Sequence, residues 1–121
     1  MRVRLVETSP FLRFLFREAL RRAHHEIVAE CTSLEEAVKL AGRLAPEVVV
    51  LDLEDGLTDW EARIQELVLH LPKSHLIVLG PSSGRPRNES WFAAYLEKPC
   101  SPQTVLTTIQ SLSMSKGLLP V

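Results

Sequence analysis

The feature that most constrains the fold is the run EVVVLDL at residues 47–53. A strand with one exposed face alternates apolar and polar residues, whereas a strand covered on both faces is a continuous run of β-branched and apolar residues. The run therefore predicts a central parallel strand with helices on both sides. Asp52 is expected at its carboxyl end.

Four shorter apolar runs predict further strands, at residues 3–6, 26–31, 75–80 and 95–97. Between them, apolar residues recur at helical spacing, and capping residues mark the helix starts: Ser9–Pro10, Ser33 with Glu36, Thr58 with Glu61, and Ser101–Pro102. The second helix is expected to run to about Leu44 and the third to end at Pro72. Residues 81–90, PSSGRPRNES, favour a loop, so the fourth helix of the pattern is predicted to be shortened or missing.

Strands that alternate with helices predict an α/β fold: a doubly wound, parallel five-stranded (βα)5 sheet of the flavodoxin-like kind. The 121 residues, 45% of them hydrophobic, suffice for one core, so we expect a single domain over 1–121 with a disordered tail at 114–121. In such sheets the binding site lies at the carboxyl ends of the strands. The residues expected there are Glu7, Thr8, Asp52, Gly80 and Lys98.

Composition argues against several classes of function. A net charge of −1 gives no basic field that would attract nucleic acid or an anionic membrane surface. Charged residues interrupt every apolar run before it could span a bilayer. Cys31 and Cys100 have no metal-like spacing and fit a reducing cytosol, and the four histidines do not cluster with them. We therefore expect a cytoplasmic protein that binds neither nucleic acid nor membrane through this domain.

An acidic residue after the first strand (Glu7), an aspartate ending the third (Asp52) and Lys98–Pro99 after the fifth together resemble the receiver domain of bacterial two-component response regulators. The resemblance spans nearly the whole chain, and it is the order and spacing of these pieces that are specific. It implies that Asp52 accepts a phosphoryl group from a histidine kinase. It also implies that Lys98, with Mg²⁺ and a hydroxyl, neutralises the transferred charge. No enzymatic turnover is expected beyond phosphoryl acceptance.

The first departure from that family lies after the first strand, where the family usually has two acids. Here Glu7 is followed by Thr8, so one charged ligand for Mg²⁺ is lost and metal binding is expected to be weak. Glu54, two residues after Asp52, either offers a substitute carboxylate or faces solvent. The candidate metal ligands are therefore Glu7, Asp52 and Glu54.

The second departure is Gly80, which stands where the family has a threonine or serine that bonds the phosphoryl oxygen. Only Ser82 or Ser83, in the following loop, could supply a hydroxyl instead. Tyr95 matches an aromatic position that family members rotate inward on activation, although an aromatic there also serves simple packing. Gly80 and Tyr95 are the candidate switch residues.

Two functions stay open. Thr8 and Gly80 favour a pseudo-receiver, an interaction module that is attenuated or independent of phosphate, whereas Asp52 and Lys98 keep a working receiver possible. Asp52 and Lys98 are expected to form an ion pair in the unmodified protein. A haloacid-dehalogenase-type phosphatase is disfavoured because the chain lacks room for its other motifs, and no Gly-rich phosphate loop is present.

Two surfaces suggest partners. Phe11 and Phe14 fall at the margin of the first helix's apolar face, where they either stay exposed or curl onto the core edge; in receivers this helix often meets the kinase-side partner. The last helix, residues 101–115, has no charged residue, which suits a chain contact as well as a Ser/Thr-rich exterior. The expected partners are a histidine kinase or other signalling protein, and a second copy through the fifth strand and last helix.

Overall fold

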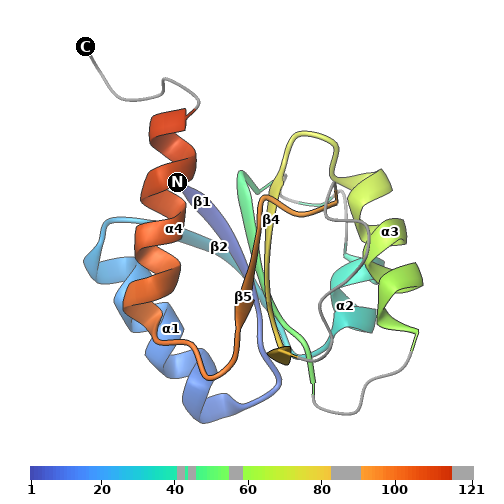
Figure 1. Cartoon of the computed structure of the whole chain (residues 1–121), viewed down its shortest axis with the longest axis horizontal. Coiled ribbons are helices and arrows are strands. Elements are labelled where there is room, and N and C mark those ends of the chain that lie inside the picture. Colours follow the sequence, from blue (N-terminus) through green and yellow to red (C-terminus); the bar gives the residue numbers. More distant parts are fainter. Residues whose placement is uncertain (41–42, 44–45, 55–58, 83–90, 116–121) are drawn as a thin grey trace.

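The computed structural model describes residues 1–40, 43, 46–54, 59–82 and 91–115. Its five strands form one parallel sheet in the order β2-β1-β3-β4-β5, which confirms the predicted α/β architecture (Figure 1). The elements are β1 (Arg2–Val6), α1 (Pro10–Arg22), β2 (Glu26–Cys31), α2 (Leu34–Lys39), β3 (Val48–Asp52), α3 (Trp60–His70), β4 (His75–Gly80), β5 (Ala94–Glu97) and α4 (Pro102–Ser115).

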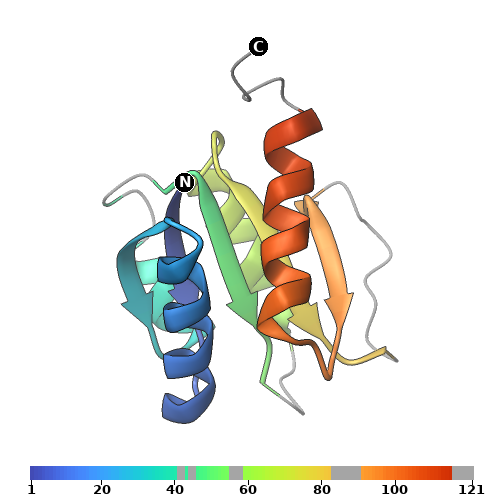
Figure 2. The same cartoon turned by 90° about the vertical axis from the view of Figure 1, so that its left-hand side faces the viewer.

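Helices cover both faces of the sheet. Figure 2 shows α1 and α4 in front of the strands, and Figure 1 shows α2 and α3 on the opposite side. Strand β3 divides its side chains between two cores, with Val48 and Val50 on the α1/α4 side and Val49 and Leu51 on the α2/α3 side. All four side chains are buried, which explains why the run does not alternate.

Three predicted helix starts are confirmed, and α4 begins at Pro102 with Ser101 Oγ accepting from the Thr104 amide at 3.3 Å. Ser9 Oγ accepts from the Leu12 amide at 3.2 Å, and Ser33 Oγ accepts from the Glu36 amide at 3.1 Å. These bonds satisfy amides that have no partner within their own helix.

The expected start of α3 was wrong. Its N-cap residue is Asp59, which takes a left-handed conformation (φ 57°) and makes no side-chain capping bond. Thr58 itself lies outside the described residues. Short polar side chains tolerate this conformation, so Asp59 turns the chain into the helix without capping it.

Three predictions concerned the end of the second helix, the fourth helix of the pattern and the C-terminal tail. Helix α2 has its C-cap at Leu40, so the expected extension to Leu44 was too long; apolar spacing alone does not set a helix end. The short or missing helix falls on 83–90, outside the described residues. Helix α4 continues to Ser115, so the first two residues of the predicted tail are helical, and 116–121 are not described. Among the helices of the described chain, none is long and apolar enough to cross a bilayer.

Candidate functional site

The carboxyl edge of the sheet collects the predicted site residues from four strands. Glu7 follows β1, Asp52 ends β3, Gly80 ends β4 and Lys98 follows β5. The register of the parallel strands aligns these ends, because Asp52 pairs with Leu79 and the Lys98 amide donates to the Gly80 carbonyl oxygen at 2.8 Å. The candidate site residues therefore meet at one end of the sheet.

Asp52 and Lys98 form the ion pair that the sequence predicts. Lys98 Nζ donates to Asp52 Oδ1 at 2.7 Å and to the Leu53 carbonyl oxygen at 2.5 Å. The Asp52 side chain is only 10% exposed, so little water competes for this charge-assisted bond. One oxygen of the candidate phospho-acceptor is thus already engaged by a cation.

Glu7 lies buried beside this pair. Burial raises the pKa of Glu7 to about 7, helped by hydrogen bonding to Asp52 and by its charge, while the Ser9 backbone bond and Lys98 oppose the rise. Glu7 Oε2 accepts from the Ser9 amide at 3.1 Å, and Oε1 has no hydrogen-bond partner among the described residues. With both carboxyls ionised, Oε1 finds no donor; a proton held between Glu7 and Asp52 satisfies it.

The donor set fits a weak divalent site. Glu7 and Asp52 bring two carboxylates together, one with an unpartnered buried oxygen, and hard cations such as Mg²⁺ prefer such oxygens. Within the part of the chain that the structure describes, no group of three or more acidic, histidine or cysteine side chains forms a metal cluster. If Mg²⁺ binds, Glu7 and Asp52 would hold it, and it would supply positive charge to a phosphoryl group.

Thr8 and Glu54, the third predicted metal ligand, contact each other at the rim of the site. The Thr8 hydroxyl lies 2.8 Å from Glu54 Oε1 and 2.8 Å from the Thr32 carbonyl oxygen, and its single proton serves one of them at a time. The structure thus engages the exposed Glu54 carboxylate at the rim through Thr8. Thr8, which the sequence showed only as a lost acid, links the ends of β1, β2 and β3.

Tyr95 fills the space in front of Gly80. A Cβ added at Gly80 would lie 2.4 Å from Tyr95 Oη and 2.9 Å from Cζ, closer than real side chains approach. Tyr95 Oη also donates to the Pro81 carbonyl oxygen at 2.7 Å, and its ring packs at 6.2 Å, centroid to centroid, from the Phe92 ring. A side chain at position 80 and the Tyr95 ring would therefore occupy the same space.

An open cleft of about 530 Å³ leads to the ion pair from the α1 side. Asp52, Lys98 and Ser82 line it together with apolar side chains. Of the two serines considered as hydroxyl donors, Ser82 therefore lies at the cleft of the acceptor, and Ser83 lies outside the described residues.

On α1 itself, Phe11 is 68% exposed and Phe14 48% exposed. The sequence left open whether these rings stay exposed or pack onto the edge of the core, and in the structure they are exposed.

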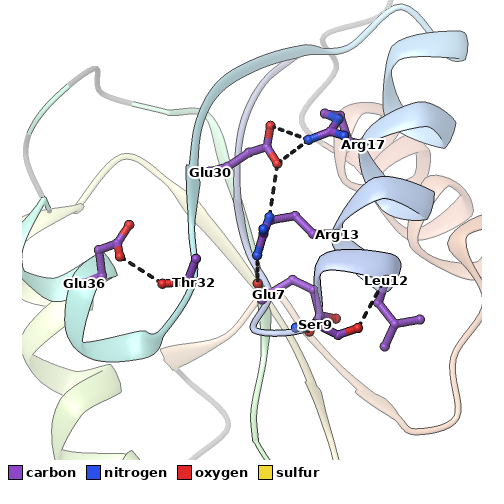
Figure 3. Close-up of polar contacts among 8 residues, drawn as sticks. All are labelled: Glu7, Ser9, Leu12, Arg13, Arg17, Glu30, Thr32 and Glu36. Carbon is purple, nitrogen blue, oxygen red and sulfur yellow. Dashed lines mark hydrogen bonds and ion pairs between the residues drawn. The ribbon is translucent and has the colours of Figure 1, made fainter.

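A network that sequence reasoning missed holds α1 against the site (Figure 3). Arg17 Nη1 donates to both oxygens of Glu30, at 2.9 and 3.2 Å, and Arg13 Nε lies 3.6 Å from Glu30 Oε1. Arg13 Nη1 then donates to the backbone oxygen of Glu7 at 2.9 Å. The i, i+4 spacing of the two arginines was the available signal, but their shared partner on β2 is not visible in the sequence.

Known proteins similar to this chain include response regulators and a receiver domain. The chemotaxis protein CheY of Thermotoga maritima is 23% identical over 116 residues, covering 93% of this chain and 97% of its own. The receiver domain of AraT, a response regulator from Geobacillus stearothermophilus, is 26% identical with a TM-score of 0.70, covering 95% and 97% of the two chains. The response regulator CheY4 of Vibrio cholerae is 19% identical with a TM-score of 0.73, covering 92% and 97%. No family model matches the sequence.

These similarities cover 92–95% of the chain. The chain has the CheY-like, flavodoxin-like fold, and the comparisons support a receiver domain of the response-regulator type. Such domains are in general signalling modules without enzymatic turnover. Whether this one accepts phosphate is decided by the site residues themselves.

Proposed function

We propose that the chain is a receiver-like signalling domain of a two-component system that acts as an attenuated or phosphorylation-independent interaction module. The observation that carries the proposal is the Tyr95 ring in front of Gly80. A receiver reports phosphorylation by rearranging residues around the new charge. Here glycine offers no hydroxyl to the phosphoryl group, and the aromatic side chain already occupies the adjoining space.

The alternative is a working receiver phosphorylated on Asp52, and the ion pair favours it. The Asp52 carboxylate is the nucleophile, and Lys98, at 2.7 Å, is placed to stay with the oxygens of a transferred phosphoryl group. Mg²⁺ held by Glu7 and Asp52 would add charge neutralisation. The difference between the two functions is therefore conformational coupling rather than the acceptor itself.

The partners follow from the surfaces. A histidine kinase or another signalling protein would contact the exposed aromatic edge of α1 at Phe11 and Phe14. The charge-free helix α4, beside β5, suits a homodimer contact. We propose a cytoplasmic protein that binds no nucleic acid and no membrane through this domain.

The test is intact-mass measurement after incubation with acetyl phosphate and Mg²⁺, with Asp52→Ala as the control. NMR resonances of the Tyr95 ring are followed in the same samples. We expect slow, partial modification that requires Asp52, or none, with Tyr95 resonances unchanged. Rapid, complete modification together with a shift of Tyr95 resonances would establish the working receiver and overturn the proposal.

A further inference from the structure

Glu30, a residue of the edge strand β2, faces helix α1. It pairs in register with Leu5, whose side chain belongs to the α1/α4 core, so Glu30 projects to the same side of the sheet. Its carboxylate accepts from Arg17 Nη1 at 2.9 and 3.2 Å and lies 3.6 Å from Arg13 Nε (Figure 3). The three charged side chains are only 21–27% exposed, so water screens their contacts less than it screens a surface pair. One carboxylate therefore holds two arginines of α1.

Arg13 extends this contact to the end of β1. Its Nη1 donates to the backbone oxygen of Glu7 at 2.9 Å, while the Glu7 amide donates to the Cys31 carbonyl oxygen at 3.0 Å. Glu7 is buried, and a buried carbonyl oxygen needs a donor. Because β1 ends at Val6, a side chain supplies that donor in place of a neighbouring strand. The backbone of Glu7 is thus held from β2 twice, directly at its amide and through Arg13 and Glu30 at its carbonyl group.

The position of this backbone decides where the Glu7 carboxyl group lies. Glu7 Oε2 accepts from the Ser9 amide at 3.1 Å, and the carboxyl group also bonds Asp52. Arg13 donates to the backbone oxygen of Glu7 and not to its carboxylate. The carboxylate therefore stays available to Asp52 and to a cation between them.

We propose that Arg13 is a positioning residue, which Glu30 and Arg17 hold in place and which keeps the Glu7 carboxylate beside Asp52. This role rests on the proposed receiver-like function, in which Glu7 and Asp52 would hold Mg²⁺. Residues that orient metal ligands from behind affect metal affinity although they never contact the ion.

Electrostatics alone predicts the opposite effect on metal binding. Arg13 carries a positive charge close to the site, so removing this charge by itself would make Mg²⁺ bind more tightly. Loss of positioning makes Mg²⁺ bind more weakly, because its octahedral coordination needs oxygens at short, fixed distances. The direction of the change in affinity therefore separates positioning from a mere charge effect.

The test is an NMR titration of Arg13→Met with Mg²⁺, followed at the Lys98 amide. The Kd should rise about tenfold relative to wild type. In the metal-free protein, hydrogen exchange of the Ser9 amide should become at least about tenfold faster, because its bond to Glu7 Oε2 is weakened. The matched control is Arg21→Met, which removes a cation of the same helix from its exposed pair with Glu18 and should change neither value.

Two further substitutions complete the design. Glu30→Gln should raise the Kd about threefold on its own, and should add nothing in an Arg13→Met background because Glu30 acts only through Arg13. Arg13→Lys keeps the charge, but an ammonium cannot bond Glu30 and Glu7 with separate, fixed donors, so Mg²⁺ binding should weaken here too. This variant serves if Arg13→Met does not fold.

Unchanged or tighter Mg²⁺ binding in Arg13→Met would overturn the proposal. So would an unchanged exchange rate at Ser9, additive effects of the substitutions at Arg13 and Glu30, or no Mg²⁺ response of the wild-type protein. The proposed function fails on a different result, a shift of Tyr95 resonances with rapid modification of the wild type, so the two failures are distinguishable.

Discussion

At the carboxyl edge of the sheet, β3 and β5 meet through opposite charges, whereas β1 and β4 meet their neighbours through hydrogen bonds and packing. Asp52 Oδ1 and Lys98 Nζ are 2.7 Å apart, and the resemblance to receivers implies a role in phosphoryl acceptance for both. Gly80 and Thr8 instead contact Tyr95 and Glu54. We call Asp52 and Lys98 the acceptor half of the site, and the contacts of Gly80 with Tyr95 and of Thr8 with Glu54 the reporting half. Because the two halves use different contacts, they can change separately. The four predictions that follow test each half against the other.

The largest effect is expected in the acceptor half, from Lys98→Met. It leaves the Asp52 and Glu7 carboxyls buried without their cation, so the free energy of unfolding should fall by about 3–4 kcal/mol near pH 8. Urea denaturation measures it. The control is Lys39→Met, which breaks the exposed pair with Glu35 and should cost less than about 0.5 kcal/mol. Equal losses in the two variants would mean that the site pair is no more than a surface contact.

The second prediction concerns Glu7, whose pKa is raised from 4.5 to about 7. The folded protein holds the proton more tightly than the unfolded chain, so the stabilisation is fully present below pH 4.5 and is lost as the pH rises to about 7. Glu7→Gln removes this dependence. Between about pH 4.5 and pH 8 the variant should gain roughly 2–3 kcal/mol relative to wild type.

Urea denaturation across this pH range provides the measurement, without added divalent metal. Glu35→Gln, at an exposed carboxylate of α2, is the matched control and should follow the wild-type curve. Parallel curves for wild type and Glu7→Gln would show that Glu7 ionises normally. Glu7 would then hold no shared proton with Asp52.

The third prediction tests the competition between Gly80 and Tyr95. Gly80→Ala places a methyl group 2.4 Å from Tyr95 Oη, and should cost about 2 kcal/mol by overpacking. In a Tyr95→Ala background the same change should cost less than about 0.5 kcal/mol, because the space is then empty. Denaturation of the four proteins of this cycle gives the coupling. An identical cost in both backgrounds would show that the Tyr95 ring does not fill the space in front of residue 80. The observation behind the proposed attenuated receiver would then be lost.

Much of the acceptor half could be predicted from the sequence because it depends on the strand pattern. The runs at 26–31 and 75–80 match β2 and β4, and the continuous run at 47–53 contains β3 with Asp52 at its end. Once the strand order is known, the ends of parallel strands must meet. The Asp52–Lys98 pair follows from that register, which is why its prediction was confirmed.

The contacts of the reporting half could not be predicted, because they depend on side-chain directions across neighbouring strands. Nothing in the sequence shows that the Tyr95 ring lies over Gly80, or that Thr8 reaches Glu54. Arg4 is a similar case, since a charged residue in a strand gives no local sign of burial. Asp59, the N-cap of α3, shows that a capping pattern indicates a helix start only to within a residue or two.

The smallest effect is expected when the β1 end is returned to the acidic type by Thr8→Asp. The new carboxylate joins Glu7 and Asp52 and gives up the Thr8 hydroxyl contact with Glu54, so Mg²⁺ should bind about tenfold more tightly, equivalent to about 1.4 kcal/mol. Thermal denaturation over a Mg²⁺ titration measures this, and Thr8→Asn supplies the same shape without the charge. If Thr8→Asp and Thr8→Asn respond alike, charge is not what the β1 end lacks. If Thr8→Asp also speeds modification of Asp52 while Tyr95 resonances stay fixed, phosphoryl acceptance improves without a conformational response, because Gly80 still offers the phosphoryl group no hydroxyl and Tyr95 still fills the space beside it.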